Sequence, residues 1–200
     1  MKKNFALIIA LIITLALPVM AAAAIWNIDP DHSNVGFKVR HLMVSNVKGS
    51  FEKFTGTIDI NDKDITKSKV EVTIDTASIN TNVQKRDEHL RSADFFDVAK
   101  YPTMTFVSKK VAKAGKDSLK VTGDLTLHGV TREVVLDVEP LAMESKDPWG
   151  NLRRGTTATT KINRKDFGLV WNKALETGGV AVGEEVLITL EIEMIKAKPK

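Results

Sequence analysis

The chain has 200 residues, 43% of them hydrophobic, and it carries 29 basic and 25 acidic side chains but no cysteine. The lack of cysteine excludes a disulfide framework, a thiolate nucleophile and a cysteine-based metal site. The charges are interspersed and sum to only +4, which argues against a nucleic-acid partner.

Residues 1–24 have the three parts of a secretory signal peptide. Lys2 and Lys3 precede an apolar run over residues 5–20, and residues 21–24 are all alanine. The run is short for a membrane-spanning helix, which needs about 20 apolar residues. We therefore expect cleavage near residue 24 and export, with residues 25–200 forming one domain.

Most of the exported part alternates between apolar and polar residues, which is typical of strands that bury one face. In the segment 185–196, Val186, Ile188 and Leu190 fall on one face and Thr189 on the other. Equivalent apolar sets are Val35, Phe37 and Val39; Ile58 and Ile60; Val70, Val72 and Ile74; and Val134, Leu136 and Val138. Turn residues separate eight predicted strands, near 33–43, 47–60, 69–77, 103–112, 118–127, 131–142, 153–163 and 184–196. This pattern indicates an all-β sandwich or an up-and-down barrel.

Residues 81–100 interrupt the alternation. Thr81 and Gln84 fit a capping box with Thr81 as the N-cap, which predicts a helix that continues through Arg91. Residues 92–100 are predicted to form a second short helical turn. Because the helix is polar and has few apolar anchors, we expect it to lie across the mouth of a barrel.

Two segments resemble the signature sequences of the YceI family. One is residues 85–97, KRDEHLRSADFFD, followed by Tyr101 and Pro102, and the other is residues 123–131, GDLTLHGVT. Further resemblance to the opening strands of the family is found in residues 28–29, 33–40 and 49–51. The resemblance extends over nearly all of the exported part.

The resemblance implies an eight-stranded antiparallel, lipocalin-like β-barrel in the periplasm. It also implies that the barrel holds a polyisoprenoid chain, such as that of a polyprenyl phosphate or a quinone. We therefore expect a non-enzymatic carrier for an apolar long-chain lipid, with no cofactor. The resemblance does not identify the lipid.

Inward apolar residues of an eight-stranded barrel either fill it as a core or line a cavity, and the alternation alone leaves both interpretations open. With the resemblance, we expect a cavity. Methionine and aromatic side chains suit its wall because they adapt to a flexible chain. The candidate lining residues are Phe37, Val39, Phe54, Met104, Phe106, Phe167, Leu169 and Trp171.

Four further residues are candidates for contacts with a polar head group. Continued alternation places His41 on the inward face, either as a wall residue or as a donor to a ligand. Arg86, His89 and Arg91 lie within two turns of the predicted helix, where they can meet an anionic group at the barrel mouth. The alternative is a solvated helix whose neighbouring acidic residues balance these charges. Arg153 is part of a second basic pair, with the residue after it, and we expect this pair on the surface.

The sequence contains no motif that points to a metal site or to catalysis. No two histidines have a metal-ligand spacing, and there is no nucleophile elbow, phosphate-binding loop or dinucleotide fingerprint. Two alternatives to the carrier remain: an enzyme acting on an isoprenoid lipid, with His41 and a carboxylate at the mouth, and a stress-response scaffold whose barrel is filled by side chains. The mouths of a barrel would also permit transient contact with a membrane or membrane protein, and a homodimer.

Overall fold

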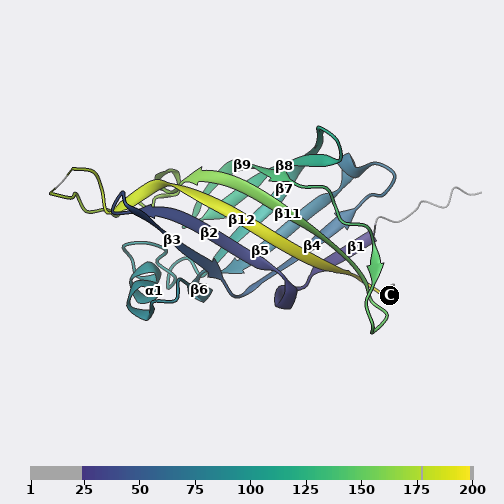
Figure 1. Cartoon of the computed structure of the whole chain (residues 1–200), viewed down its shortest axis with the longest axis horizontal. Coiled ribbons are helices and arrows are strands. Elements are labelled where there is room, and N and C mark those ends of the chain that lie inside the picture. Colours follow the sequence, from purple (N-terminus) through teal and green to yellow (C-terminus); the bar gives the residue numbers. More distant parts are fainter. Residues whose placement is uncertain (1–23, 177, 199–200) are drawn as a thin grey trace, which may run out of the picture.

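The structure is a computed structural model that describes residues 24–176 and 178–198 of the chain. Apart from Ala24, the predicted signal peptide lies outside the described residues. The described part is one strongly curved sheet that wraps into a barrel (Figure 1), with the α-helix beside one end and β1 and the C-terminus at the other. We call these the helix end and the terminal end of the barrel.

Eight antiparallel strands close the barrel, which confirms the predicted fold class. Each strand pairs with the next, and the last returns to the first. In order around the barrel they are β1 (Ala24–Ile28), β4 (Phe54–Ile60), β5 (Lys69–Asp75), β7 (Thr103–Ala114), β8 (Ser118–Leu127), β9 (Val130–Val138), β11 (Leu152–Asn163) and β12 (Val182–Lys196).

The 15-residue strand β12 is long enough to pair with two different strands along one of its edges. Near the terminal end that edge pairs with β1, and further along it pairs with β2 (Asn34–His41). Strand β2 pairs in turn with β3 (Ser45–Phe51), whose far edge meets the short strand β6 (Ile79–Asn80). Beyond β6, residues up to the start of β7 complete the helix end with turns and a helix instead of strands.

Every predicted strand corresponds to a strand of the sheet, but the predicted strand over 47–60 is two strands. The backbone N–H groups of Glu52 and Lys53 donate to the carbonyl and hydroxyl oxygens of Ser78, at 3.1 and 3.0 Å, instead of to a neighbouring strand. The predicted strand is therefore broken at residues 52–53 into β3 and β4, which pair with different neighbours. Strands β1, β6 and β10 (Ser145–Lys146) were not predicted, since each has only two to five residues.

The helix α1 (Gln84–Arg91) forms where the sequence predicts it, but the capping box is wrong. Val83 is the N-cap, and the Thr81 hydroxyl donates to the Asp87 carboxylate inside the helix instead of capping it. Residues 92–100 form hydrogen-bonded turns and not a second helical turn. Among the described residues no helix is long and apolar enough to cross a membrane. Single 3-10 turns occur at Pro30–His32, Ile65–Lys67, Thr76–Ser78 and Arg164–Phe167, which are η1 to η4.

The terminal end is sealed by a tightly packed floor. Trp26, Ile60 and Met194 are at most 1% exposed and pack against one another. The guanidinium of Arg154 lies 5.3 Å from the centre of the Trp26 ring. Water and ligands are therefore excluded from this end of the barrel.

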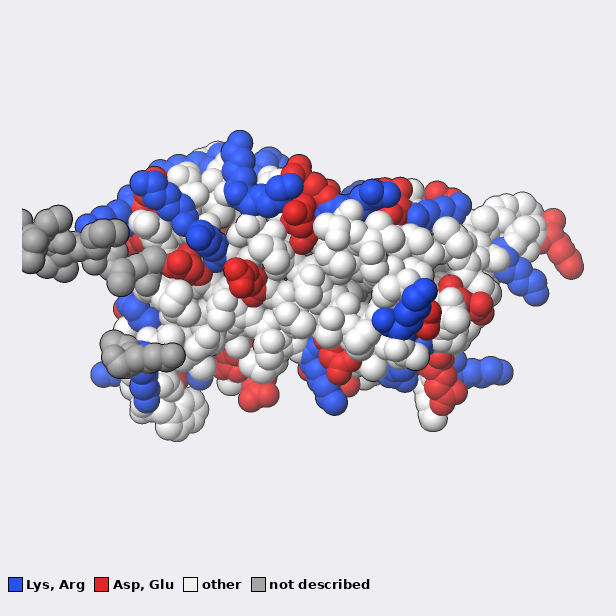
Figure 2. Space-filling model, turned by 180° about the vertical axis from the view of Figure 1, so that it is seen from behind, with Lys and Arg blue, Asp and Glu red and all other residues white. Residues whose placement is uncertain are grey.

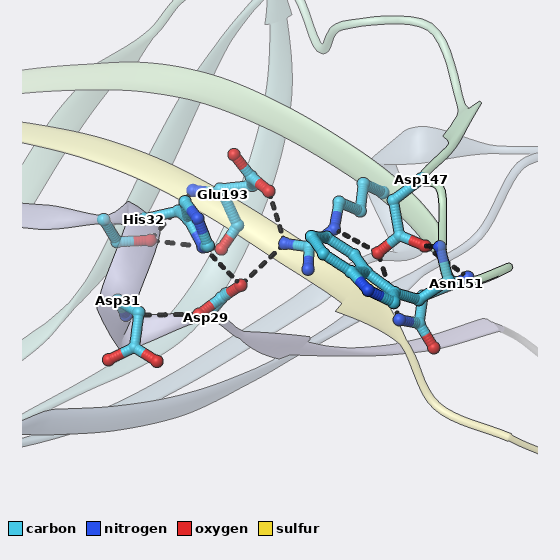
Figure 3. A network of polar contacts seen from close by, with 9 residues as sticks. Asp29, Asp31, His32, Asp147, Asn151 and Glu193 are labelled. Atoms are coloured by element: carbon cyan, nitrogen blue, oxygen red, sulfur yellow. Dashed lines mark hydrogen bonds and ion pairs between the residues drawn. The ribbon is translucent and has the colours of Figure 1, made fainter.

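A buried ion cluster around Arg153 fastens the floor to the loop that precedes β11. The Arg153 guanidinium contacts Asp29 at 2.6 Å and Asp147 at 2.8 Å, and it also pairs with Glu193 of β12. Figure 3 shows these acidic residues converging from η1, from the loop before β11 and from β12. Arg153 is thus largely buried, which corrects the expectation that it lies on the surface.

The hydrogen bonds in this cluster lower the pKa values of two carboxyl groups. Burial raises the pKa of Asp29, but hydrogen bonds from Arg153, His32 and the Asp31 N–H outweigh it and hold this pKa below its ordinary value. Burial also raises the pKa of Asp147, and hydrogen bonds from Arg153, Asn151 and two backbone N–H groups lower it much further. Both groups therefore stay ionised around their shared guanidinium.

Candidate functional site

The barrel encloses an apolar cavity of about 260 Å³, measured as the space open to the centre of a water-sized sphere. The cavity extends from Ile60 and Met194 at the floor to Leu90 and Phe96 at the helix end. A void needs only roughly 10–15 Å³ to hold one water molecule, so this cavity is far larger than a packing defect. The barrel is therefore hollow and is not filled by its own side chains.

The wall of the cavity is built from the inward faces of the strands. All the apolar residues that the alternation grouped in β2, β4, β5, β9 and β12 line it. Six of the candidate lining residues lie on the wall as well: Phe37, Val39, Phe54, Met104, Phe106 and Leu169. The period-two pattern thus identified the lining of the cavity.

Two aromatic rings leave the middle of the cavity free because they lie flat over glycines. A Cβ atom added to Gly49 would stand 2.5 Å from Cζ of Phe37, its cross-strand partner. A Cβ atom added to Gly123 would stand 2.5 Å from Cζ of Phe106. Any larger residue at these glycines would push the rings toward the centre of the barrel.

The wall offers almost no polar chemistry. Among the described residues that line the cavity, the only ones with polar side chains are Ser68, Thr156, Thr160 and Arg164, and none is Asp, Glu or His. The enzyme alternative needs His41 and a carboxylate, and neither group is among the described residues that line the cavity. A hydrocarbon, which needs no hydrogen bonds, fits such a surface.

Arg164 is the one charged residue on the wall, and it is only 3% exposed. Its guanidinium donates to the carbonyl oxygens of Gly183, Leu169 and Val182. Burial lowers the pKa of this guanidinium, although an arginine remains protonated at neutral pH. Its contacts tie η4 to the start of β12, so we assign it a structural role. Arg164 continues the inward alternation of β11 after Ile162, and this signal was overlooked in the sequence.

Three candidates do not lie on the cavity wall. His41 ends β2, where its register partners are Ser45 and Val182, and it is not among the lining residues. Phe167 is buried in η4 beneath the wall. Trp171 packs instead against Phe95 and His89, with ring centres 5.0 Å apart in both pairs. Strand β11 ends at Asn163, so the period-two alternation of a strand does not apply to Phe167 and Trp171.

The basic residues of α1 hold the helix in place. Arg86 donates from Nε to the Thr81 hydroxyl at 2.7 Å and from a terminal nitrogen to the Thr81 carbonyl at 2.8 Å. Arg91 donates at 2.7 Å to the carbonyl oxygens of both Ala77 and Ile79. His89 pairs with Asp94 at 2.8 Å. These contacts lie within residues 76–101, and the role of the three side chains toward a head group stays a prediction.

Three residues near the floor have the geometry of a metal site but share an arginine instead. The ligand atoms of Asp29, His32 and Glu193 all lie within 4.8 Å of one another. Arg153 donates to both carboxylates, and His32 Nδ1 contacts the same Asp29 oxygen at 2.9 Å. The guanidinium supplies the positive charge that these groups need, so a second cation would be repelled.

Sequence reasoning missed the residues of the α1 segment that complete the cavity. Leu90, Phe95 and Phe96 line it at the helix end, and Phe96 meets Phe51 edge-on with ring centres 5.6 Å apart. The signal was the pair of phenylalanines in an otherwise polar stretch. Their side chains cover the part of the wall that the strands do not reach.

The chain is similar to known proteins over most of its length. The family model described as YceI-like domain matches residues 26–194. Protein YceI of Escherichia coli O157:H7 is 42% identical over 180 residues, which cover 89% of this chain and 90% of that protein. The crystal structure of the Campylobacter jejuni YCEI protein is 36% identical with a TM-score of 0.67, covering 79% of this chain and 90% of that one.

The fold is also shared with a more distant protein. A polyisoprenoid binding domain from Saccharophagus degradans superposes with a TM-score of 0.63 at 18% identity, covering 86% of this chain and 98% of that one. At this identity the likeness concerns the fold alone.

Proposed function

Because the chain belongs to the YceI-like domain family and its barrel is hollow, we propose that it binds and carries a polyisoprenoid or a similar long-chain lipid. The match of the YceI-like domain model to residues 26–194 confirms the family resemblance inferred from residues 85–97 and 123–131. One structurally similar protein is described as a polyisoprenoid binding domain, which supports the choice of ligand class.

The apolar cavity is the observation that carries the proposal. A hydrocarbon chain makes no hydrogen bonds, so an apolar interior of this size suits it. Burial contributes about 0.8 kcal/mol per methylene, or roughly 4 kcal/mol for the five carbons of one unit, before ordering costs. A few units thus suffice for stable binding without any polar contact.

The proposed setting is the periplasm. The predicted signal peptide supports export. A lipid tail that crosses an aqueous compartment needs a shelter from water, and an apolar cavity sealed at one end provides it. The protein would then act on lipids by binding and transfer.

Native mass spectrometry of the exported protein purified from cells tests this function. We expect a bound mass that organic extraction removes and that is identified as an isoprenoid or similar lipid. Protein that is consistently free of lipid, and that does not take up a soluble short isoprenoid such as farnesol, would contradict the proposal. Conversion of the extracted lipid on incubation with fresh protein would favour the enzyme alternative.

A further inference from the structure

The turn between β2 and β3 exposes three consecutive apolar side chains at the helix end of the barrel. Leu42, Met43 and Val44 are 41%, 40% and 76% exposed. Figure 1 shows this turn in dark purple beside the loop that leads into β12, far from the C-terminus. The Leu42 N–H donates to the carbonyl of Ala181 at 2.8 Å, so the two segments are joined. We call residues 42–44 the apolar tip.

The backbone of the apolar tip adopts a conformation that its residues disfavour. Leu42 and Met43 have φ angles of 49° and 60°. The other described non-glycine residues with positive φ are all Asn, Asp or His, which tolerate this region far better. A turn of this kind normally uses Asn and Gly. Two large apolar residues are thus held in an unfavourable conformation and face solvent, a combination that favours a functional contact over a stabilising one.

The hairpin behind the apolar tip carries positive charge only. Residues 34–51 include Lys38, Arg40 and Lys48 but no Asp or Glu. Lys38 and Lys48 are direct cross-strand partners, an arrangement of like charges that costs stability. No carboxylate of the described residues pairs with any of the three cations.

The inner face of the same hairpin is part of the cavity wall. Val35, Phe37 and Val39 line the cavity, whereas the three cations occupy the alternate positions on the other face. Only two residues separate Val39 from Leu42 in the sequence. A hydrocarbon chain that enters beside the apolar tip would therefore lie close to the cavity wall formed by the same hairpin.

We propose that the β2–β3 hairpin is a membrane-docking element: its apolar tip enters the interfacial layer of a bilayer and its cations meet anionic lipid head groups. Exposed apolar residues next to Lys and Arg are the composition that binds such surfaces. This inference rests on the proposed function, because it names the surface through which the protein would take up its lipid.

A second apolar surface at the terminal end does not fit this role. Met143 and Trp149 are 91% and 80% exposed in the loop before β11. Leu141 of the same loop lines the cavity beside the floor formed by Trp26, Ile60 and Met194. Unlike the β2–β3 hairpin, however, this loop carries more acidic than basic residues, with Glu139, Glu144 and Asp147 against Lys146, so an anionic surface would repel it, and the loop supplies the matched control.

The test compares binding of the exported protein to phosphatidylethanolamine vesicles with and without phosphatidylglycerol, measured by cosedimentation. We expect binding that requires phosphatidylglycerol. The double variant Leu42→Asn with Met43→Gly should bind at least about tenfold more weakly, yet unfold at an equal or higher temperature, because Asn and Gly accept the positive φ angles. The double variant Lys38→Gln with Lys48→Gln should lose about fivefold in binding for each cation removed.

Controls separate this inference from the proposed function. The double variant Met143→Ser with Trp149→Ser should bind vesicles as the unchanged protein does. All variants should still take up farnesol, detected by native mass spectrometry, because their cavity walls are intact. If the unchanged protein takes up farnesol but ignores the vesicles, or if only the Met143 and Trp149 variant loses binding, the docking proposal is wrong while the carrier function stands. If the unchanged protein carries no lipid and takes up no farnesol, the carrier function itself fails.

Discussion

The ring of Phe37 lies over Gly49, its partner across the β2–β3 pair, so closely that an added Cβ atom would stand 2.5 Å from the ring. The atoms that such a Cβ would meet all belong to side chains, those of Phe37 and Thr81. The absent side chain at Gly49 therefore lets an aromatic residue line the wall without occupying the space inside it.

Replacing Gly49→Ala should reduce the amount of lipid that co-purifies with the protein. The new methyl group would turn the Phe37 ring toward the centre of the cavity, at a cost in stability of about 1–3 kcal/mol. Native mass spectrometry gives the ratio of lipid-bound to free protein. The double variant Phe37→Leu with Gly49→Ala should recover lipid binding, since the smaller side chain removes the clash with the ring and leaves only the contact with the Thr81 methyl group. Equal lipid loss in the single and double variants would show that the ring is not the cause.

Replacing Phe106→Glu should abolish lipid retention more than it disturbs the sheet. The carboxylate would face an apolar wall that offers it no partner, and it would draw water into the cavity. Val107→Glu is the matched control because Val107 is the next residue of β7, is 47% exposed and is absent from the cavity wall. Circular dichroism reports the fold, and extraction followed by mass spectrometry reports the lipid. Unchanged lipid content in the Phe106 variant would mean that the assigned wall is wrong.

The Arg153 cluster should make the protein sensitive to acid. The pKa values of Asp29 and Asp147 are lower in the folded protein than their ordinary value of 3.8. Their contribution to the free energy of unfolding is thus complete above about pH 4 and is lost as the pH falls toward the folded-state values. Urea unfolding at a series of pH values between about 6 and 3 should show this decline.

The neighbouring arginine provides the control for this prediction. Arg153→Met should lower stability at neutral pH and flatten the acid-dependent decline, because the carboxyl groups then lose the partner that lowers their pKa values. Arg154→Met should keep the decline, since the ion pair that the described residues give Arg154 is with the exposed Asp62, at 3.2 Å, and not with these two groups. Identical pH profiles for the two variants would show that Arg153 is not responsible.

Asp87 should hold α1 against the barrel. Its carboxylate accepts the Thr81 N–H at 2.9 Å and the Thr81 hydroxyl, and it is buried. Asp87→Ala leaves these donors without a partner, which costs about 1–3 kcal/mol. Hydrogen exchange should accelerate in residues 76–101 and stay unchanged in β7 and β8. Asp87→Asn should restore slow exchange because an amide oxygen can still accept; uniform acceleration throughout the barrel would contradict a local role.

The strands and the lining of the barrel were predictable because a half-buried strand has a strict period of two. Val134, Leu136 and Val138, for example, were grouped from the sequence and all face the cavity. The same rule extends to Arg164, whose burial could have been foreseen. The hollow interior itself was not predictable from the alternation, because Phe37 and Phe106 leave space only by lying over glycines of other strands.

Two of the remaining misassignments arise where the chain leaves regular structure. Phe167 and Trp171 were expected on the cavity wall, but Asn163 caps η4 and Gly168 adopts a φ of 81°, which turns the chain. Thr81 has the sequence of an N-cap, yet its hydroxyl bonds a residue one turn into the helix, and Arg86 bonds Thr81 in turn. Which partner such a residue binds depends on the three-dimensional arrangement around it, which a local sequence pattern does not encode.

The floor of Trp26, Ile60 and Met194 fills the terminal end of the barrel with buried side chains. A lipid bound as proposed must enter tail first and leave from the same end of the barrel, so its hydrophilic end stays at the rim. A recipient protein or membrane could therefore contact the head group while the lipid tail is still inside the cavity. Uptake and release of the lipid would use the same end of the barrel, so one lipid must leave before the next can bind.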